Sequence, residues 1–135
     1  MRLFFYRSFF VSMVVFVYLL TIAPSSGQPS PIPYLDKALH FLIFLLLTFV
    51  LDFCTRRPLK EHYFLIFLLI GFGVFIEVSQ YFTATRSAEF LDWVFDSLGV
   101  LVYLLFAPNI SIGLKKWNIY YPLSYSFLYW RCIFW

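Results

Sequence analysis

The sequence predicts an all-α membrane protein, a polytopic helix bundle with four transmembrane helices and an aromatic, interfacial C-terminal segment. The chain of 135 residues is 62% hydrophobic and 24% aromatic, and only 13% of it is charged. A soluble domain carries about a quarter charged residues, so this composition favours an integral membrane protein. The few Lys and Arg residues occur in clusters, which is typical of membrane orientation signals rather than nucleic-acid binding. The whole chain, residues 1–135, is therefore predicted to be a single membrane domain.

Four apolar stretches have about the length that crosses a bilayer, which is roughly 20 helical residues. They are residues 3–23, 38–53, 63–82 and 90–108. The second reaches the required length only when its polar head, from residue 34, is counted in the interface. Each stretch is predicted to form one transmembrane helix.

The two ends of the chain each allow two interpretations. Residues 1–23 are predicted to be a retained anchor helix, because about 20 continuous apolar residues are long for a signal peptide. Arg2, Arg7 and the small residues of APSSGQPSP keep a cleaved signal peptide open as the alternative. Residues 117–135 are uncharged up to Trp130 and rich in Trp and Tyr. We expect this tail to lie in the inner interface, with a fifth span as the alternative.

The basic residues indicate which side of the membrane each loop faces. Lys37 and Arg86 fall on one side of the predicted membrane. Basic residues before the first span, between the second and third, and after the fourth fall on the other side: Arg2, Arg7, Arg56, Arg57, Lys60, Lys115 and Lys116. Because cytoplasmic loops carry the excess of Lys and Arg, both termini are predicted to be cytoplasmic.

This topology gathers polar residues at the extracytoplasmic face. Asp36, Lys37 and His40 head the second span, while Glu77 and Gln80 lie in the last two turns of the outward-going third. The outer loop and the first two turns of the fourth span add a further polar set: Arg86, Ser87, Glu89, Asp92 and Asp96. Five of the seven carboxylates of the chain are therefore expected at one depth.

Helical spacing places these groups on shared faces. Asp36 and His40 are four residues apart, and Glu77 and Gln80 are three apart, so each pair lies on one side of its helix. A continuous line of the same kind runs down the fourth span: Asp92, Asp96, Gly99 and Tyr103. Glycines that permit close helix approach occur at the same levels: Gly71, Gly73 and Gly99.

The acidic residues of this face are expected to turn away from lipid. An Asp near the bilayer centre costs about 2.5–3.5 kcal/mol, and less near the interface. The carboxylates must therefore face one another, water or a ligand. Within the predicted arrangement, the nearest ion pairs are Asp36 with Lys37 or His40, and Glu77 with Arg86.

Three segments of the chain resemble the signature blocks of the VanZ-like family of small bacterial membrane proteins. They are DKALHFLIF, EVSQYF and RSAEFLDWVFDSLG, in this order, and the resemblance covers a core at residues 34–106. The matching positions are Asp36, Lys37, His40, Phe41, Glu77, Gln80, Arg86, Asp92, Asp96 and Gly99. The chain departs from the family at residues 83–85, where a Pro-Gly turn is common, and at Tyr103, where a small residue is common.

The resemblance implies a protein of the bacterial cytoplasmic membrane that acts at the outer leaflet. The family's named association is resistance to glycopeptide antibiotics, especially lipid-tailed ones such as teicoplanin. The molecules within reach of such a site are lipid headgroups, lipid-linked cell-wall precursors and the lipid-tailed antibiotic itself.

Acid–base chemistry or ligand binding at this face is the first functional hypothesis. His40 suits proton transfer near neutral pH, and it belongs to a group of candidate catalytic residues: Asp36, His40, Glu77, Asp92 and Asp96. The candidate substrate-binding residues can hold a phosphate, a carboxylate or another polar headgroup: Lys37, Gln80 and Arg86. No metal ligand set and no cofactor is assigned. No known nucleophile motif accompanies these residues, so both an enzyme and a binding protein stay open.

Two alternatives compete with this hypothesis. In the first, the polar groups serve only to hold the bundle together, through contacts that contribute about 0.6 kcal/mol each in membranes. Alternatively, the acidic excess binds a cation with oxygen ligands and His40, in a binding or transport module. Four short helices are few for a transporter, which keeps a homo-oligomer open.

Overall fold

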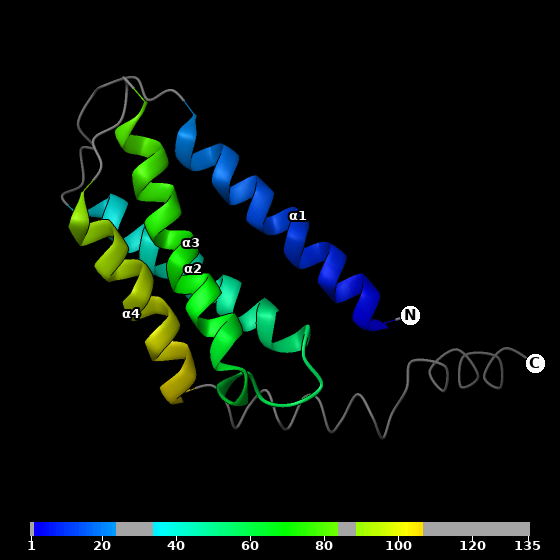
Figure 1. The fold of residues 1–135 in the computed structure, drawn as a ribbon. Helices are drawn as coiled ribbons and strands as arrows, with labels where there is room; N and C mark the ends of the chain where they lie inside the picture. Colours follow the sequence, from blue (N-terminus) through cyan, green and yellow to red (C-terminus); the bar gives the residue numbers. More distant parts are fainter. Residues whose placement is uncertain (1, 24–33, 84–88, 107–135) are drawn as a thin grey trace, which may run out of the picture.

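A computed structural model describes residues 2–23, 34–83 and 89–106, and these residues form helices and no strand. The helices are α1 (Arg2–Ile22), α2 (Leu35–Phe53), α3 (Tyr63–Tyr81) and α4 (Phe90–Phe106), with a short 3-10 helix, η1 (Leu59–Glu61), between α2 and α3. The predicted all-α class is confirmed, and each predicted stretch corresponds to one helix (Figure 1). The predicted interfacial tail lies outside the described residues.

Local signals in the sequence set the helix ends. Tyr34 precedes α2 in the left-handed conformation, with φ 61°. Pro58 follows the end of α2 and cannot continue a helix, because its ring removes an N–H donor. The hydroxyl of Thr83 donates to the carbonyl oxygens of Ser79 and Gln80, at 3.0 and 2.9 Å, and so closes α3. These ends place the polar residues of the loops next to the first and last turns of the helices.

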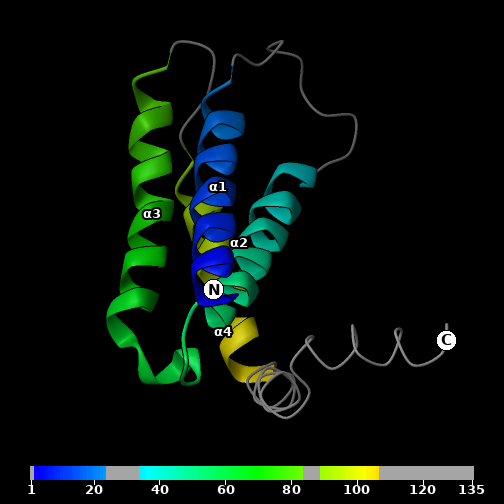
Figure 2. The same ribbon diagram turned by 90° about the vertical axis from the view of Figure 1, so that its right-hand side faces the viewer.

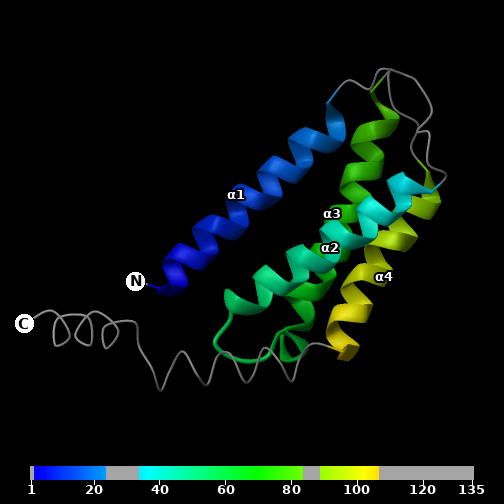
Figure 3. The same ribbon diagram turned by 180° about the vertical axis from the view of Figure 1, so that it is seen from behind.

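The four helices pack as a ring in the order α1, α2, α4 and α3. The most extensive contact is between α2 and α4, while α3 packs on α4, and α1 packs on α2 and α3. Figures 1 to 3 show that the start of α2, the end of α3 and the start of α4 lie at one end of the bundle, which we call the site end. The core between the helices is apolar and includes Phe44, Leu47, Leu69, Ile76 and Val100.

The contact between α2 and α4 depends on Gly99. A Cβ atom at this position would overlap the carbonyl oxygen of Phe41 and would lie 3.0 Å from the backbone nitrogen of Leu45. The two helix backbones therefore approach as closely as the absence of a side chain permits. This approach brings the first turns of α2 and α4 together at the site end.

At the end of the bundle opposite the site end, Asp52 forms a buried polar contact. The carboxylate of Asp52, at the end of α2, accepts hydrogen bonds from the backbone N–H of Leu59 at 2.8 Å and from the hydroxyl of Tyr103 at 2.9 Å. The length of the Tyr103 side chain lets its hydroxyl reach from α4 to α2. The contact joins α2 to α4 at this end of the bundle.

The outer surface of the helices is apolar over most of its length. Helices α1 and α3 expose large hydrophobic side chains, among them Phe4, Phe16, Phe64, Phe67 and Phe75. Both helices are long and apolar enough to cross a membrane, over Leu3–Ile22 and Tyr63–Tyr81. The other two predicted spans are not confirmed in this way, because α2 carries three charged residues and α4 has only 17 residues. Exposed apolar surface of this extent is typical of a lipid-facing protein.

Candidate functional site

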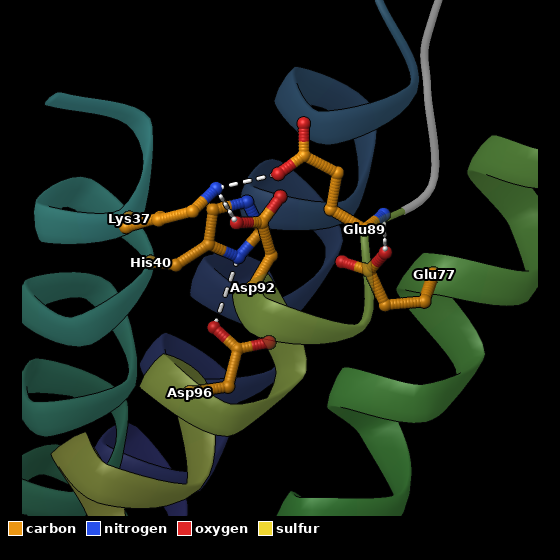
Figure 4. A network of polar contacts seen from close by, with 6 residues as sticks. All are labelled: Lys37, His40, Glu77, Glu89, Asp92 and Asp96. Carbon is orange, nitrogen blue, oxygen red and sulfur yellow. Dashed lines mark hydrogen bonds and ion pairs between the residues drawn. The ribbon is translucent and has the colours of Figure 1, made fainter. Parts of the chain in front are cut away.

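Three helices contribute polar side chains to a cluster at the site end. Figure 4 shows Lys37 and His40 from α2, Glu77 from α3, and Asp92 and Asp96 from α4, all directed toward the space between the helices. The cluster also includes Glu89, the residue before α4, and Asp36, in the first turn of α2. We call these seven residues the polar cluster.

The deepest contact of the polar cluster joins His40 to Asp96. The Nδ1 atom of His40 lies 3.0 Å from Oδ1 of Asp96. The side chain of His40 is 7% exposed and that of Asp96 is fully buried. A carboxylate bonded to one ring nitrogen fixes both the tautomer and the orientation of an imidazole. Nδ1 of His40 is therefore committed to Asp96, and Nε2 is the ring nitrogen left for other chemistry.

Nearer the surface, Lys37 joins α2 to the start of α4. Its ammonium nitrogen lies 2.6 Å from Oε2 of Glu89 and 3.1 Å from Oδ1 of Asp92. Asp92 is almost completely buried, whereas the side chain of Glu89 is half exposed. An ammonium group has three N–H donors, so these two contacts leave one donor for a ligand.

Glu77 connects α3 to the same region. Its Oε2 atom accepts a hydrogen bond of 2.9 Å from the backbone N–H of Glu89, so its carboxylate holds the segment that begins α4. Its second oxygen, Oε1, is buried without a hydrogen-bond partner among the described residues, and so is Oδ2 of Asp96. A buried carboxylate oxygen without a donor is costly, and such atoms mark where a proton, water or ligand would be stabilised.

The close approach of α3 and α4 positions these two carboxylates. A Cβ atom on Gly73 would lie 3.0 Å from Oδ2 of Asp96 and 3.2 Å from Cδ1 of Trp93. The indole Nε1 of Trp93 donates to the carbonyl oxygen of Ile70 at 3.3 Å. Trp93 therefore ties α4 to α3 beside Asp96, and Gly73 leaves the room that the carboxylate occupies.

Asp36 lies at the exposed edge of the polar cluster. One ligand atom each from Asp36, His40 and Asp92 lies within 4.8 Å of the other two. Neither Lys37 nor His40 forms its ion pair with Asp36, because both side chains reach across to α4 instead. The interhelical contacts of the cluster thus replace the contacts within α2 that the sequence predicts.

Two of the predicted site residues are placed differently or lie outside the described part of the chain. Gln80 is 2% exposed, and its Nε2 donates to the carbonyl oxygen of Thr21 on α1 at 3.1 Å. Its side chain joins α3 to α1, away from the contacts of Lys37 and His40. Arg86, and with it the predicted pair with Glu77, lies outside the described residues.

Glu89 is the member of the polar cluster that the sequence alone does not single out as a site residue. It lies three residues before Asp92, and its carbonyl oxygen accepts the N–H of Asp92 at 2.9 Å at the start of α4. An acidic residue at a helix start is a common structural signal, so its pattern is ambiguous. One signal was available in the sequence: Lys37 is the single lysine among the acidic residues of this face, so it is expected to pair with several of them, Glu89 included.

Acidic side chains outnumber basic ones in the polar cluster among the described residues. Five carboxylates surround one ammonium group, and the remaining member is an imidazole. This set can orient an imidazole for proton transfer, hold a phosphate- or carboxylate-bearing group through Lys37, or bind a cation through carboxylate oxygens.

The comparison with protein families bears on this arrangement. A model of the family described as VanZ/LLP1 matches residues 2–112, most of the chain. The chain belongs to the VanZ/LLP1 family. The match extends beyond the predicted core at residues 34–106 and includes α1. No curated protein and no solved structure matches the chain. Family membership together with the exposed apolar surface makes this a membrane protein of the VanZ-like kind.

Proposed function

We propose that all four helices cross the bacterial cytoplasmic membrane, with both termini in the cytoplasm and the polar cluster at the outer face. Helices of 17 to 21 residues are about 26–32 Å long, which matches a hydrocarbon core of about 30 Å. The end opposite the polar cluster carries Arg7, Arg56 and Arg57, as the positive-inside rule requires of a cytoplasmic end.

The protein acts, in this proposal, on a lipid or lipid-tailed molecule in the outer leaflet. Its substrate is a membrane lipid, a lipid-linked cell-wall precursor or a lipid-tailed glycopeptide, and the resistance association that the sequence resemblance implies favours the last. The apolar tail would remain beside the exposed hydrophobic surface of the helices, while the headgroup reaches the polar cluster. Because the bilayer holds the tail, the headgroup stays at the depth of the polar cluster. The protein therefore needs no deep pocket to retain the molecule.

The buried contact between His40 and Asp96 is the observation that carries the proposal. The carboxylate on Nδ1 fixes the tautomer of the ring and leaves Nε2 for proton transfer, which is the arrangement that an acid–base group requires. In this proposal Asp96 orients His40, whose Nε2 transfers the proton, and Lys37 uses its remaining N–H on the phosphate or carboxylate of the headgroup.

The remaining residues support these groups. Asp92 holds Lys37 and Glu77 positions the start of α4, while Asp36 faces the entering headgroup at the exposed edge. Arg86 is assigned to headgroup binding from the sequence. Gln80 keeps α3 against α1, so its effect on substrate is indirect.

Antibiotic susceptibility tests this function directly. A glycopeptide-susceptible bacterium that expresses the chain is expected to tolerate more teicoplanin, with no change toward a glycopeptide without a lipid tail. His40→Gln should return the inhibitory concentration to that of the host, because loss of an acid–base group lowers activity by about 100-fold or more. The amount of each protein in the membrane is measured in the same cells.

Glu61→Gln is the matched control for this experiment. It also alters one polar side chain, but in η1 at the opposite end, where Glu61 forms an exposed ion pair with Arg57. This variant should protect as well as the unchanged chain does. Equal protection by His40→Gln would contradict the catalytic role of the imidazole, and equal protection against the tailless antibiotic would contradict recognition of a lipid tail.

Cation binding is a second candidate function, and the proximity of Asp36, His40 and Asp92 favours it. Two carboxylates and an imidazole whose other nitrogen is held by a carboxylate are a donor set that suits Zn²⁺ or Mn²⁺. Calorimetric titration of the purified protein with each ion should then show one site. Asp36→Asn should weaken binding by about tenfold or more, and Glu61→Gln should leave it unchanged. Absence of heat with either ion would exclude this candidate.

A further inference from the structure

The end of the bundle opposite the polar cluster contains a cavity of about 800 Å³ between α1, α2 and the start of α3. Its walls are apolar along α1 and α3, with Phe10, Leu51 and Leu65 among the lining residues. Its rim is polar and basic and includes Arg7, Arg56, Arg57 and His62. None of these residues belongs to the polar cluster.

A second, fully apolar cavity of about 170 Å³ adjoins the first. The two share Phe10, Leu51 and Leu65, and the second continues between α1 and α3 to Leu69 and Phe72. Together they form an apolar path that begins at the basic rim and runs toward the middle of the bundle. A path with a polar mouth and an apolar interior has the chemical pattern of a lipid.

Helix α1 is loosely attached beside this path. Val17 is the one buried side chain among the described side chains of α1. Figures 1 and 3 show α1 inclined to α3 and diverging from it toward the N-terminus. Protein interiors are normally packed without such spaces, so an occupant would complete the contact between α1 and the other helices.

The rim presents groups that suit an anion. The Nε atom of Arg7 donates to the carbonyl oxygen of Cys54 at 3.3 Å, which holds the guanidinium at the junction of α1 and α2. Arg56 is exposed, and Nε2 of His62 is buried without a hydrogen-bond partner among the described residues. Guanidinium groups bind phosphate through two parallel N–H donors. Two carboxylates lie at this end of the bundle: Glu61 is paired with Arg57, and Asp52 accepts hydrogen bonds from Leu59 and Tyr103.

We propose that an anionic phospholipid of the cytoplasmic leaflet occupies this site, with its phosphate at Arg7, Arg56 and His62 and one acyl chain between α1 and α3. The basic rim argues against two other occupants, which are the tail of the chain and a zwitterionic lipid. The tail of the chain, residues 117–135, contains no Asp or Glu, and a zwitterionic lipid has no net charge to match the arginines. The lipid completes the attachment of α1, independently of what the polar cluster does.

Lipid titration followed by native mass spectrometry tests the proposal. The full chain, purified in detergent and stripped of lipid, is mixed with phosphatidylglycerol or with phosphatidylcholine of the same acyl chains. One phosphatidylglycerol is expected to bind with clear preference over phosphatidylcholine. Arg56→Gln should weaken that binding about fivefold, since one basic side chain contributes roughly this factor toward an anionic lipid.

Lys60→Gln is the matched control, because it removes the same charge from the same end at an exposed position outside the cavity lining. This variant should bind phosphatidylglycerol as the unchanged chain does. Val14→Phe, which fills the apolar path, should weaken binding without removing charge. Melting temperatures measured without lipid show that each variant is folded. Equal loss in Lys60→Gln, or equal binding of the two lipids, would overturn the proposal.

Discussion

Replacement of Gly99 by alanine is expected to disrupt the bundle. The added Cβ atom would overlap the carbonyl oxygen of Phe41 and crowd the backbone nitrogen of Leu45. Both are backbone atoms of a packed helix, so neither can move without moving α2 as a whole. Overpacking costs about 1–3 kcal/mol, and a site that cannot relax lies at the upper end of that range. The variant should therefore accumulate poorly in the membrane and melt at a much lower temperature in detergent.

Gly71→Ala provides the matched control for this substitution. Gly71 lies within α3, and a Cβ atom there would meet no atom within 4 Å. Alanine is favoured over glycine in a helix by about 1 kcal/mol, so this variant should be at least as stable as the unchanged protein. If both variants melted at the same temperature, α2 and α4 would have to lie farther apart than the structure places them. The contact between His40 and Asp96 would then be in doubt as well.

The helices of this protein could be predicted from the sequence because lipid-facing helices leave a simple pattern. The end of α2 before Pro58 and the start of α4 at Phe90 follow from where the apolar runs stop. Six residues of the polar cluster could also be predicted, because ionisable side chains in apolar helices face the interior of the bundle or water rather than lipid. The end of the bundle at which these groups gather depends on their position along each helix, which is read directly from the sequence.

The partners within the cluster could not be predicted in the same way. The spacing of Asp36 and His40 suggests a contact within α2, yet His40 pairs with Asp96. That choice depends on how closely α4 approaches, and therefore on the fit of Gly99 against α2. Gln80 is a similar case, because its contact with Thr21 depends on where α1 packs. Distances between helices are properties of packing, and no spacing along one chain segment encodes them.

Lys37→Met is expected to have the other large effect on stability. Lys37 is the one cation of the polar cluster among its described residues, and it pairs with the almost completely buried Asp92. Removing one partner of a buried ion pair leaves an uncompensated charge and costs about 3–5 kcal/mol. Because Lys37 keeps some exposure at the end of the bundle, we expect a loss near the lower end of that range. Melting of the purified protein in detergent measures it, with Lys60→Met as the control at the opposite end.

A second substitution shows whether the cost comes from the unpaired carboxylate. Asp92→Asn in the Lys37→Met background removes the uncompensated charge, so the double variant should regain most of the lost stability. Asp92→Asn alone should have a small effect, because Lys37 keeps its contact with Glu89. If the double variant were no more stable than Lys37→Met, the loss would come from packing of the lysine side chain. Full recovery would instead show that the carboxylates of this face require a cation, which is the property that either a bound headgroup or a metal ion would exploit.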